Sequence, residues 1–246
     1  MDDFCGGKLM HTQEALGESV AIQVTDLEVG VPDRTEPLFS NVNLQVKQGE
    51  IVALVGLSGC GKSVLAKSIA GMIPNMIKLP IQGEVKLWGK DIKTMSPIER
   101  ISAIGYIFQN PDNQIFSSVV ETELAFGPEN LCLSYEEIKE RVTQVLQALH
   151  MEEYRYANTN ELSGGQKQLV AIGSILTLQP RILICDEILC QLDEASCNRV
   201  IELLQTLREN GMTIFIIEHD LNKLKFVDKI YTIKERQFIE FQGEIG

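Results

Sequence analysis

The sequence predicts an α/β fold with a mainly parallel sheet, an antiparallel β subdomain and a helical subdomain. Apolar runs of strand length at residues 51–55, 182–185 and 213–217 alternate with segments of helical periodicity. Such alternation is typical of parallel strands that are joined by helices. A glycine-rich loop, residues 56–63, lies between the first of these runs and a helix start. Strand, loop and helix in this order predict a P-loop NTPase with a RecA-like sheet.

The glycine-rich loop reads Gly-Leu-Ser-Gly-Cys-Gly-Lys-Ser. Its glycines allow backbone N–H groups to turn inward around a β-phosphate, Lys62 reaches the β- and γ-phosphates, and the Ser63 hydroxyl can ligate Mg²⁺. The alternative is a glycine-rich turn that caps a helix and binds nothing. We expect a nucleoside triphosphate, ATP, and Mg²⁺ to be bound here, by Gly56, Leu57, Ser58, Gly59, Cys60, Gly61, Lys62 and Ser63.

The first half of the chain supplies the antiparallel subdomain and the first strands of the sheet. Residues 20–29 and 42–48 are predicted to be antiparallel strands around a loop that contains two prolines. The glycine-rich loop should be followed by a helix at residues 62–70. Strands are then predicted at residues 83–87 and 104–108, before the chain leaves for a helical insertion.

The helical subdomain is expected at about residues 110–170. Ser134 begins a capping box, and apolar residues then recur at helical intervals, so that one helix face should be buried. These apolar residues are Ile138, Val142, Val145 and Leu149. A helix at residues 167–177 follows, and a later helix carrying Val200, Leu203, Leu204 and Leu207 should stop at Gly211.

Three polar residues follow two of the apolar strands. Asp186 and Glu187 end one strand, and His219 comes after another. Because parallel strands of an open α/β sheet end at the same edge, we expect these side chains to lie beside the glycine-rich loop. Asp186 is suited to hold Mg²⁺ through water and Glu187 to polarise the attacking water. Taken singly, Asp-Glu is often only a helix N-terminus, and a lone histidine is more often structural.

Residues 162–166, Leu-Ser-Gly-Gly-Gln, resemble the signature motif of ABC ATPases. Together with the P-loop, Gln109, the two carboxylates and His219, they occur in the order of that family. The resemblance implies that Gln109 is the Q-loop residue, which couples metal and water to the membrane partner, and that His219 contacts the γ-phosphate. It also implies that one subunit completes the nucleotide site of another, through Ser163, Gly164, Gly165, Gln166 and Asp193.

The segment Gln-Asn-Pro-Asp-Asn-Gln at residues 109–114, with Ala-Phe-Gly-Pro-Glu-Asn at 125–130, narrows the resemblance. It looks like the ATPase subunit of an energy-coupling factor, or cobalt-type, ABC transporter, over roughly residues 20–246. In that family Gln114 and the helix it opens meet the membrane partner; an ordinary helix packed on the core is the alternative. The resemblance implies an ATPase that powers import of a vitamin or transition-metal ion. Its partners would be a transmembrane coupling subunit, a substrate-binding membrane subunit and a second ATPase, identical or different.

Composition agrees with a peripheral, cytoplasmic location at the membrane. The chain has 246 residues and a net charge of −12, and no run approaches the roughly twenty apolar residues that span a bilayer. The acidic charge argues against nucleic acid as the main partner. We expect a polar tail at residues 1–18 without a signal peptide, and a nucleotide-binding domain at 19–246. The six cysteines show no ligand-like spacing, which favours free thiols in a reducing compartment.

The chain departs from the family pattern at several positions. Val31 stands where an adenine-stacking aromatic residue is usual, residues 188–190 are Ile-Leu-Cys, and Leu169 replaces a frequent arginine. We also expect no room before Gly246 for the C-terminal extension that helps to pair such ATPases. Two other functions are considered: a soluble ABC ATPase acting on nucleic acid or ribosomes, and an ATP-sensing module with impaired hydrolysis.

Overall fold

A computed structural model describes residues 19–32, 35–241 and 243. The polar tail expected at residues 1–18 lies outside the described residues. In chain order the strands and helices are β1 (Val20–Val29), β2 (Phe39–Lys47), β3 (Ile51–Val55), α1 (Lys62–Ile69), β4 (Ile81–Leu87), β5 (Lys90–Asp91), α2 (Pro97–Ala103), β6 (Ile104–Ile107), α3 (Val120–Asn130), α4 (Tyr135–Ala148), α5 (Gly164–Leu176), β7 (Ile182–Asp186), α6 (Glu194–Glu209), β8 (Thr213–Ile217), β9 (Lys229–Lys234) and β10 (Gln237–Glu240). Short 3₁₀ turns are η1 (Ile92–Thr94), η2 (Pro111–Asn113), η3 (Glu152–Tyr154), η4 (Thr159–Glu161) and η5 (Leu221–Leu224).

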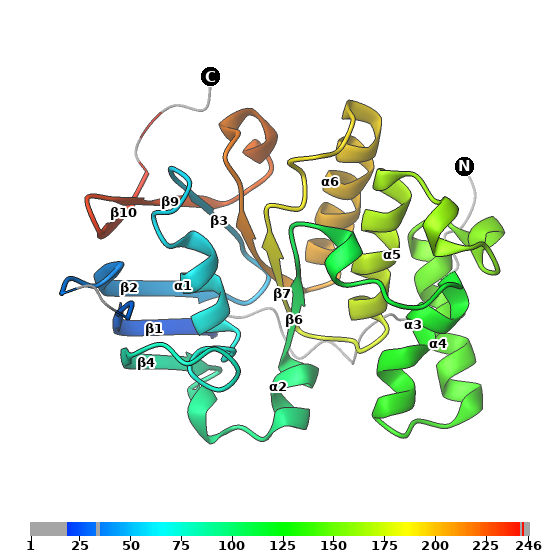
Figure 1. Cartoon of the computed structure of the whole chain (residues 1–246), viewed down its shortest axis with the longest axis horizontal. Helices are drawn as coiled ribbons and strands as arrows, with labels where there is room; N and C mark the ends of the chain where they lie inside the picture. Colours follow the sequence, from blue (N-terminus) through cyan, green and yellow to red (C-terminus); the bar gives the residue numbers. More distant parts are fainter. Residues whose placement is uncertain (1–18, 33–34, 242, 244–246) are drawn as a thin grey trace.

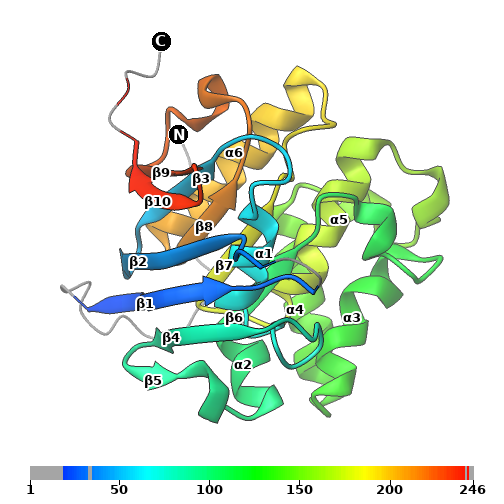
Figure 2. The ribbon, with the colours of Figure 1, turned by 60° about the vertical axis from the view of Figure 1, so that its left-hand side comes forward.

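The strands form one sheet with the order β5-β4-β1-β2-β10-β9-β3-β8-β7-β6. The pairs from β9 through β3, β8 and β7 to β6 are all parallel. At the other end β1, β2, β4 and β5 pair antiparallel, and Figure 2 brings these strands forward. The α/β fold with a mainly parallel sheet and an antiparallel β subdomain is therefore confirmed.

The central strands are buried on both faces because each face packs against a separate layer. Every residue of β3, β7 and β8 is buried. In β3, Ile51, Ala53 and Val55 join the cluster that contains α3 to α6, whereas Val52 and Leu54 join the cluster of α1 and the antiparallel strands. This is the two-residue alternation of a strand. In Figure 1 the helices α3 to α6 accordingly lie to one side and β1, β2 and β4 to the other.

The helices α3, α4 and α5 pack together beside the parallel strands (Figure 1). Helix α4 begins at the predicted cap, since the Ser134 hydroxyl accepts a hydrogen bond from the Glu137 N–H. Of its predicted apolar face, Val142, Val145 and Leu149 are buried, and Ile138 is partly buried. The pattern thus predicted this buried face correctly.

Some element bounds differ from the sequence expectation. Helix α5 begins at Gly164 rather than at 167, because Ser163 and Gln166 form a capping box. The expectation that Gln114 opens a helix is wrong: it ends the turn η2, and α3 begins only at Val120. Pro111 at the first position of η2 and the Asn110 side chain, which accepts from Asp112 N, favour this turn, while the Gln114 side chain bonds outside it to Phe108 N and Ala171 O.

Candidate nucleotide-binding site

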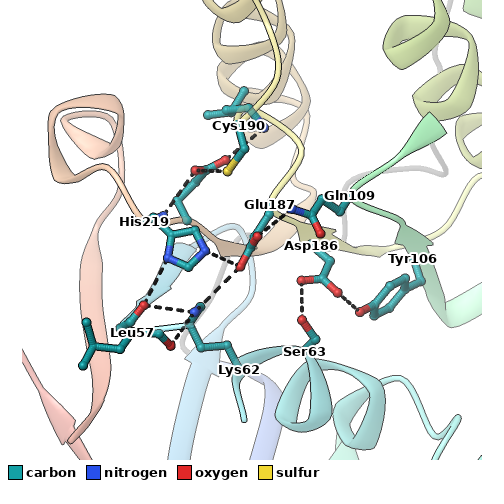
Figure 3. Close-up of polar contacts among 12 residues, drawn as sticks. Leu57, Lys62, Ser63, Tyr106, Gln109, Asp186, Glu187, Cys190 and His219 are labelled. Carbon is teal, nitrogen blue, oxygen red and sulfur yellow. Dashed lines mark hydrogen bonds and ion pairs between the residues drawn. The ribbon is translucent and has the colours of Figure 1, made fainter. Parts of the chain in front are cut away.

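The glycine-rich loop connects the buried end of β3 to the start of α1 (Figure 3). Two of its glycines, Gly59 (φ +80°) and Gly61 (φ +104°), have left-handed backbone conformations. A side chain on Gly61 would also place its Cβ 3.0 Å from the Phe39 ring. Such glycine conformations form the concave row of N–H groups that suits a phosphate.

Lys62 is 4% exposed and lies at the mouth of this loop. Its Nζ donates to the carbonyl oxygens of Gly56 (3.0 Å) and Leu57 (3.1 Å), and it lies 3.7 Å from Glu187 Oε1. A buried ammonium group is costly unless it is paired, and these carbonyls and the carboxylate supply the pairing. The Lys62 amine is thus held between the glycine-rich loop and the Glu187 carboxylate.

Asp186, at the end of β7, has both carboxylate oxygens occupied by hydroxyl donors (Figure 3). The Ser63 hydroxyl donates to Oδ1 at 2.9 Å, and the Tyr106 hydroxyl donates to Oδ2 at 2.6 Å. Burial, followed by the charge of Asp186, raises the pKa of Tyr106 well above its ordinary value, so that its hydroxyl stays a donor. The oxygen atoms of Ser63 and Asp186 are of the kind that Mg²⁺ prefers, so these residues fit the metal.

Glu187 lies at the centre of the cluster (Figure 3). Its Oε2 accepts a hydrogen bond of 2.8 Å from Gln109 Nε2, and its Oε1 lies 2.6 Å from His219 Nε2. The Glu187 backbone is left-handed, with φ +55°, and its N–H donates to Ile217 O at 3.0 Å. This backbone turn brings the carboxylate to the edge where β7 and β8 end.

His219 bridges the loop and the carboxylate. Its Nδ1 lies 3.1 Å from Gly56 O, on the opposite side of the ring from Glu187. The structure therefore brings together the predicted residues Lys62, Ser63, Gln109, Asp186, Glu187 and His219, drawn in Figure 3.

The signature residues and Asp193 lie at the N-termini of α5 and α6, and their hydrogen bonds are local. The Ser163 hydroxyl accepts from Gln166 N at 3.3 Å, and Gln166 Oε1 accepts from Ser163 N at 2.8 Å. Asp193 accepts from the N–H and the hydroxyl of Ser196, and these bonds lower the pKa of Asp193. None of these bonds joins the cluster around Glu187.

The family model described as ABC transporter matches residues 39–189. The chain belongs to this family. It is 39% identical over 223 residues to the energy-coupling factor transporter ATP-binding protein EcfA of Methanosarcina acetivorans, covering 90% of this chain and 79% of that protein. The EcfA protein of Methanocaldococcus jannaschii is 38% identical over 222 residues, covering 89% and 77%.

A solved structure of cbiO1 from Clostridium perfringens, part of the ABC transporter complex cbiONQ, has a TM-score of 0.81 and 32% identity. The matched region covers 90% of this chain and 88% of the cbiO1 chain. The chain spans only 33% and 38% of the length of two other relatives, from Methanosarcina acetivorans and Methanosarcina mazei. This member of the ABC transporter family is thus similar to proteins named as energy-coupling factor transporter ATP-binding proteins, and ATP is the nucleotide that its family binds.

Sequence reasoning missed two residues of this candidate site, Tyr106 and Glu218. The Glu218 side chain is fully buried and accepts from Leu189 N (2.9 Å), His219 N (3.3 Å) and Cys190 Sγ (3.4 Å). Burial is the main cause that raises the pKa of Glu218. A carboxylate directly after the apolar run at residues 214–217 was the available signal for Glu218, and a tyrosine within a buried strand was the signal for Tyr106.

The segment 188–190, which departs from the family pattern, packs against the rest of the protein. Ile188 and Leu189 are buried in the core, while the Cys190 thiol bonds to Glu218. Burial and the Glu218 charge raise the pKa of Cys190 to about 12. Ile188 and Leu189 thus take part in packing, and Cys190 in a hydrogen bond to Glu218, which lies between β8 and His219.

A cavity of about 1250 Å³ lies beside the phosphate loop of the ABC ATPase. Its wall combines the loop and His219 with residues of β9, β10 and the chain after them, among them Thr232, Ile233, Ile239 and Phe241. Among the described residues, no helix is long and apolar enough to cross a membrane.

Proposed function

We propose that the chain is the subunit of an energy-coupling factor type ABC transporter that binds Mg-ATP and hydrolyses it to power import of a vitamin or transition-metal ion. The observation that carries this proposal is the position of Glu187, which contacts Gln109 and His219 and lies 3.7 Å from Lys62. A carboxylate beside a phosphate loop is placed to activate water for phosphoryl transfer. The names of the EcfA relatives and the likeness to cbiO1 support the type of transporter.

Each residue of the cluster has a distinct task in this proposal. Gly56 to Gly61 and Lys62 bind the phosphates, and Glu187 orients and polarises the attacking water. His219 contacts the γ-phosphate, and Gln109 holds the position of Glu187 and senses the metal. Ser63, Asp186 and Gln109 would hold Mg²⁺, which, when bound, offsets negative charge on the transferring phosphoryl group.

The partners in the proposal are two membrane subunits and a second ATPase. Phe116, before α3, and Phe126, in α3, are 62% and 45% exposed. Their rings stack edge to face, with 4.3 Å between the ring centroids. An exposed aromatic pair of this kind favours contact with a coupling segment of a membrane subunit. The chain would then lie at the cytoplasmic face of the membrane, and a separate membrane protein would bind the substrate.

The second ATPase completes the nucleotide site in this proposal. Ser163, Gly164, Gly165, Gln166 and Asp193 would bind the nucleotide held by the partner's phosphate loop. The free N–H groups at the N-terminus of α5 suit a phosphate. Homodimer and heterodimer both satisfy this arrangement.

The test compares the parent chain with Glu187→Gln. We expect this variant to bind Mg-ATP and form a dimer in light scattering, with turnover lowered by about 100-fold or more because water activation is lost. Glu202→Gln, on the exposed face of α6, is the matched control and should hydrolyse ATP like the parent.

Absence of ATP binding by the parent would contradict the proposal. Equal turnover in the parent and Glu187→Gln would contradict the proposed role of Glu187 in water activation. ATP binding without dimer or turnover by the parent alone would indicate a heterodimer, for which co-expression with a second ATPase restores turnover.

The two alternative functions make different predictions. An ATPase acting on nucleic acid or ribosomes needs a basic face, whereas this chain has a net charge of −12, and we propose that it binds no nucleic acid. An ATP sensor without hydrolysis is excluded if the parent turns over ATP and Glu187→Gln does not.

A further inference from the structure

Residues 109–117, which connect β6 to α3, form a segment that we call the strap. At its first residue, Gln109 Nε2 donates to Glu187 Oε2 at 2.8 Å. At its end, the carboxylate of Glu123 accepts from Phe116 N (3.1 Å) and Ser117 N (2.8 Å). Glu123 is 2% exposed and belongs to α3. The strap is thus bonded to the candidate water-activating carboxylate at one end and to the helical part of the fold at the other.

The side-chain amide of Gln114 binds the middle of the strap to two backbones. Its Oε1 accepts from Phe108 N at 3.1 Å, next to Gln109. Its Nε2 donates to Ala171 O in α5 at 2.8 Å and lies 3.4 Å from Ser174 Oγ. Because both ends of this half-buried amide are bonded, its loss would take the acceptor from the Phe108 N–H and break the link to α5, where Ala171 O keeps the Ser174 hydroxyl as a donor.

An ion pair ties the strap to the same helix. Lys167 Nζ, one residue after the signature motif, lies 2.7 Å from Asp112 Oδ1. Asp112 is largely exposed, so the pair contributes little to stability alone. Like the Gln114 bonds, this ion pair joins the strap to α5, whose first turn carries the signature residues.

We infer that Gln114 is a positioning residue that makes the contact between Gln109 and Glu187 depend on the position of α5 in the same chain. The inference rests on the proposed function. When the signature residues of this chain bind the nucleotide of the second subunit, a shift of α5 pulls the strap through Gln114. The shift then reaches Glu187 through Gln109. The two nucleotide sites of the dimer are coupled in this way, and such coupling between binding sites is reciprocal.

The first test is a double-mutant cycle on turnover. Gln114→Leu should lower kcat about tenfold and leave the ATP dissociation constant within about twofold, because Gln114 does not contact the phosphate loop. If Gln114 acts through Gln109, the variant with both Gln109→Ala and Gln114→Leu should be no slower than Gln109→Ala alone. Effects that multiply in the double variant would overturn the inference.

The matched control is Gln144→Leu. Gln144 is also a half-buried glutamine of the helical part, but its amide bonds only to Glu140 within α4. We expect Gln144→Leu to leave kcat and its response to Gln109→Ala unchanged. A tenfold loss of kcat in this control would show that helical-part glutamines act through general packing, against the inference.

The second test is independent of turnover. Amide hydrogen exchange at residues 108–117, measured relative to the amides of β8, should become at least about tenfold faster in Gln114→Leu than in Gln144→Leu. Equal exchange in the two variants would overturn the inference. A parent chain that does not hydrolyse ATP, even with a second ATPase, would contradict the proposed function, and the exchange comparison would still decide whether Gln114 holds the strap.

Discussion

At the scale of single residues, Tyr106 controls a carboxylate that it shares with Ser63. Tyr106→Phe removes only the hydroxyl that donates to Asp186 Oδ2 at 2.6 Å. Hydrogen bonds to charged groups contribute about 1.5–3 kcal/mol, so Asp186 should lose part of its fixed orientation. We expect the Mg²⁺ concentration needed for binding of a fluorescent ATP analogue to rise about tenfold, with binding in the absence of Mg²⁺ unchanged. Tyr156→Phe, at an exposed tyrosine, is the control, and an unchanged Mg²⁺ requirement would contradict this role.

Glu218 makes stability depend on pH. Burial raises its pKa above the ordinary value of 4.5, so between that value and the raised pKa the folded chain binds more protons than the unfolded chain. Stability therefore falls as the pH rises through this window. Glu218→Gln should remove this contribution and give a flatter profile of urea midpoints above pH 4.5. Superimposable profiles of parent and variant would show that the Glu218 carboxyl does not titrate differently on folding.

At this scale, the sequence predicted those residues of the candidate site whose chemical use follows from their place in the chain. Lys62, Asp186 and His219 follow from strand ends and a glycine-rich loop. The tie of Gln114 to α5 was not predictable, because it depends on a contact between residues 57 positions apart in the chain. Tyr106 and Glu218 were missed for the same reason: their partners come from other strands and loops.

At the scale of elements, β6 and α5 approach each other at Gly105. A Cβ on Gly105 would lie 2.2 Å from Ile175 Cγ2 and 3.1 Å from Pro180 Cγ. Gly105→Ala should therefore lower the free energy of unfolding by about 1–3 kcal/mol through overpacking. Gly164→Ala is the control for stability, since nothing lies within 4 Å of its Cβ position. Equal urea midpoints for the two variants would contradict the close packing of β6 on α5.

The central elements were predicted because burial on both faces leaves uninterrupted apolar runs. Strands β3, β7 and β8 carry such runs, whereas helix α4 was predicted from apolar residues that recur at helical intervals along one face. The elements β5, β9, β10 and α2 were not predicted, because their residues are largely exposed or alternate without a clear period. Their positions are set by pairing with distant strands, as for β9 along β3 and for β10 between β9 and β2.

At the scale of the whole molecule, a side-chain contact links the antiparallel strands to the parallel sheet. The Arg181 guanidinium, just before β7, lies 4.0 Å from the centre of the Trp88 ring, in the turn between β4 and β5. Arg181→Ala should lower the free energy of unfolding by about 1 kcal/mol. Trp88 is the only tryptophan of the chain, so its emission should shift in the native variant. Arg199→Ala on exposed α6 is the control, and an unchanged spectrum and urea midpoint in Arg181→Ala would contradict the link.

The left-handed backbone of Glu187 lowers folding stability at the residue that we propose to activate water. A residue with a Cβ in this conformation costs roughly 1–2 kcal/mol, which a glycine would avoid. Selection for stability alone would thus favour glycine at this position. The chain instead keeps a carboxylate on a strained turn, fixed by the bond from its N–H to Ile217. In the proposed function, residue 187 therefore gives up folding stability to keep a carboxylate for catalysis, and we expect a variant that is more stable through a glycine here to be inactive.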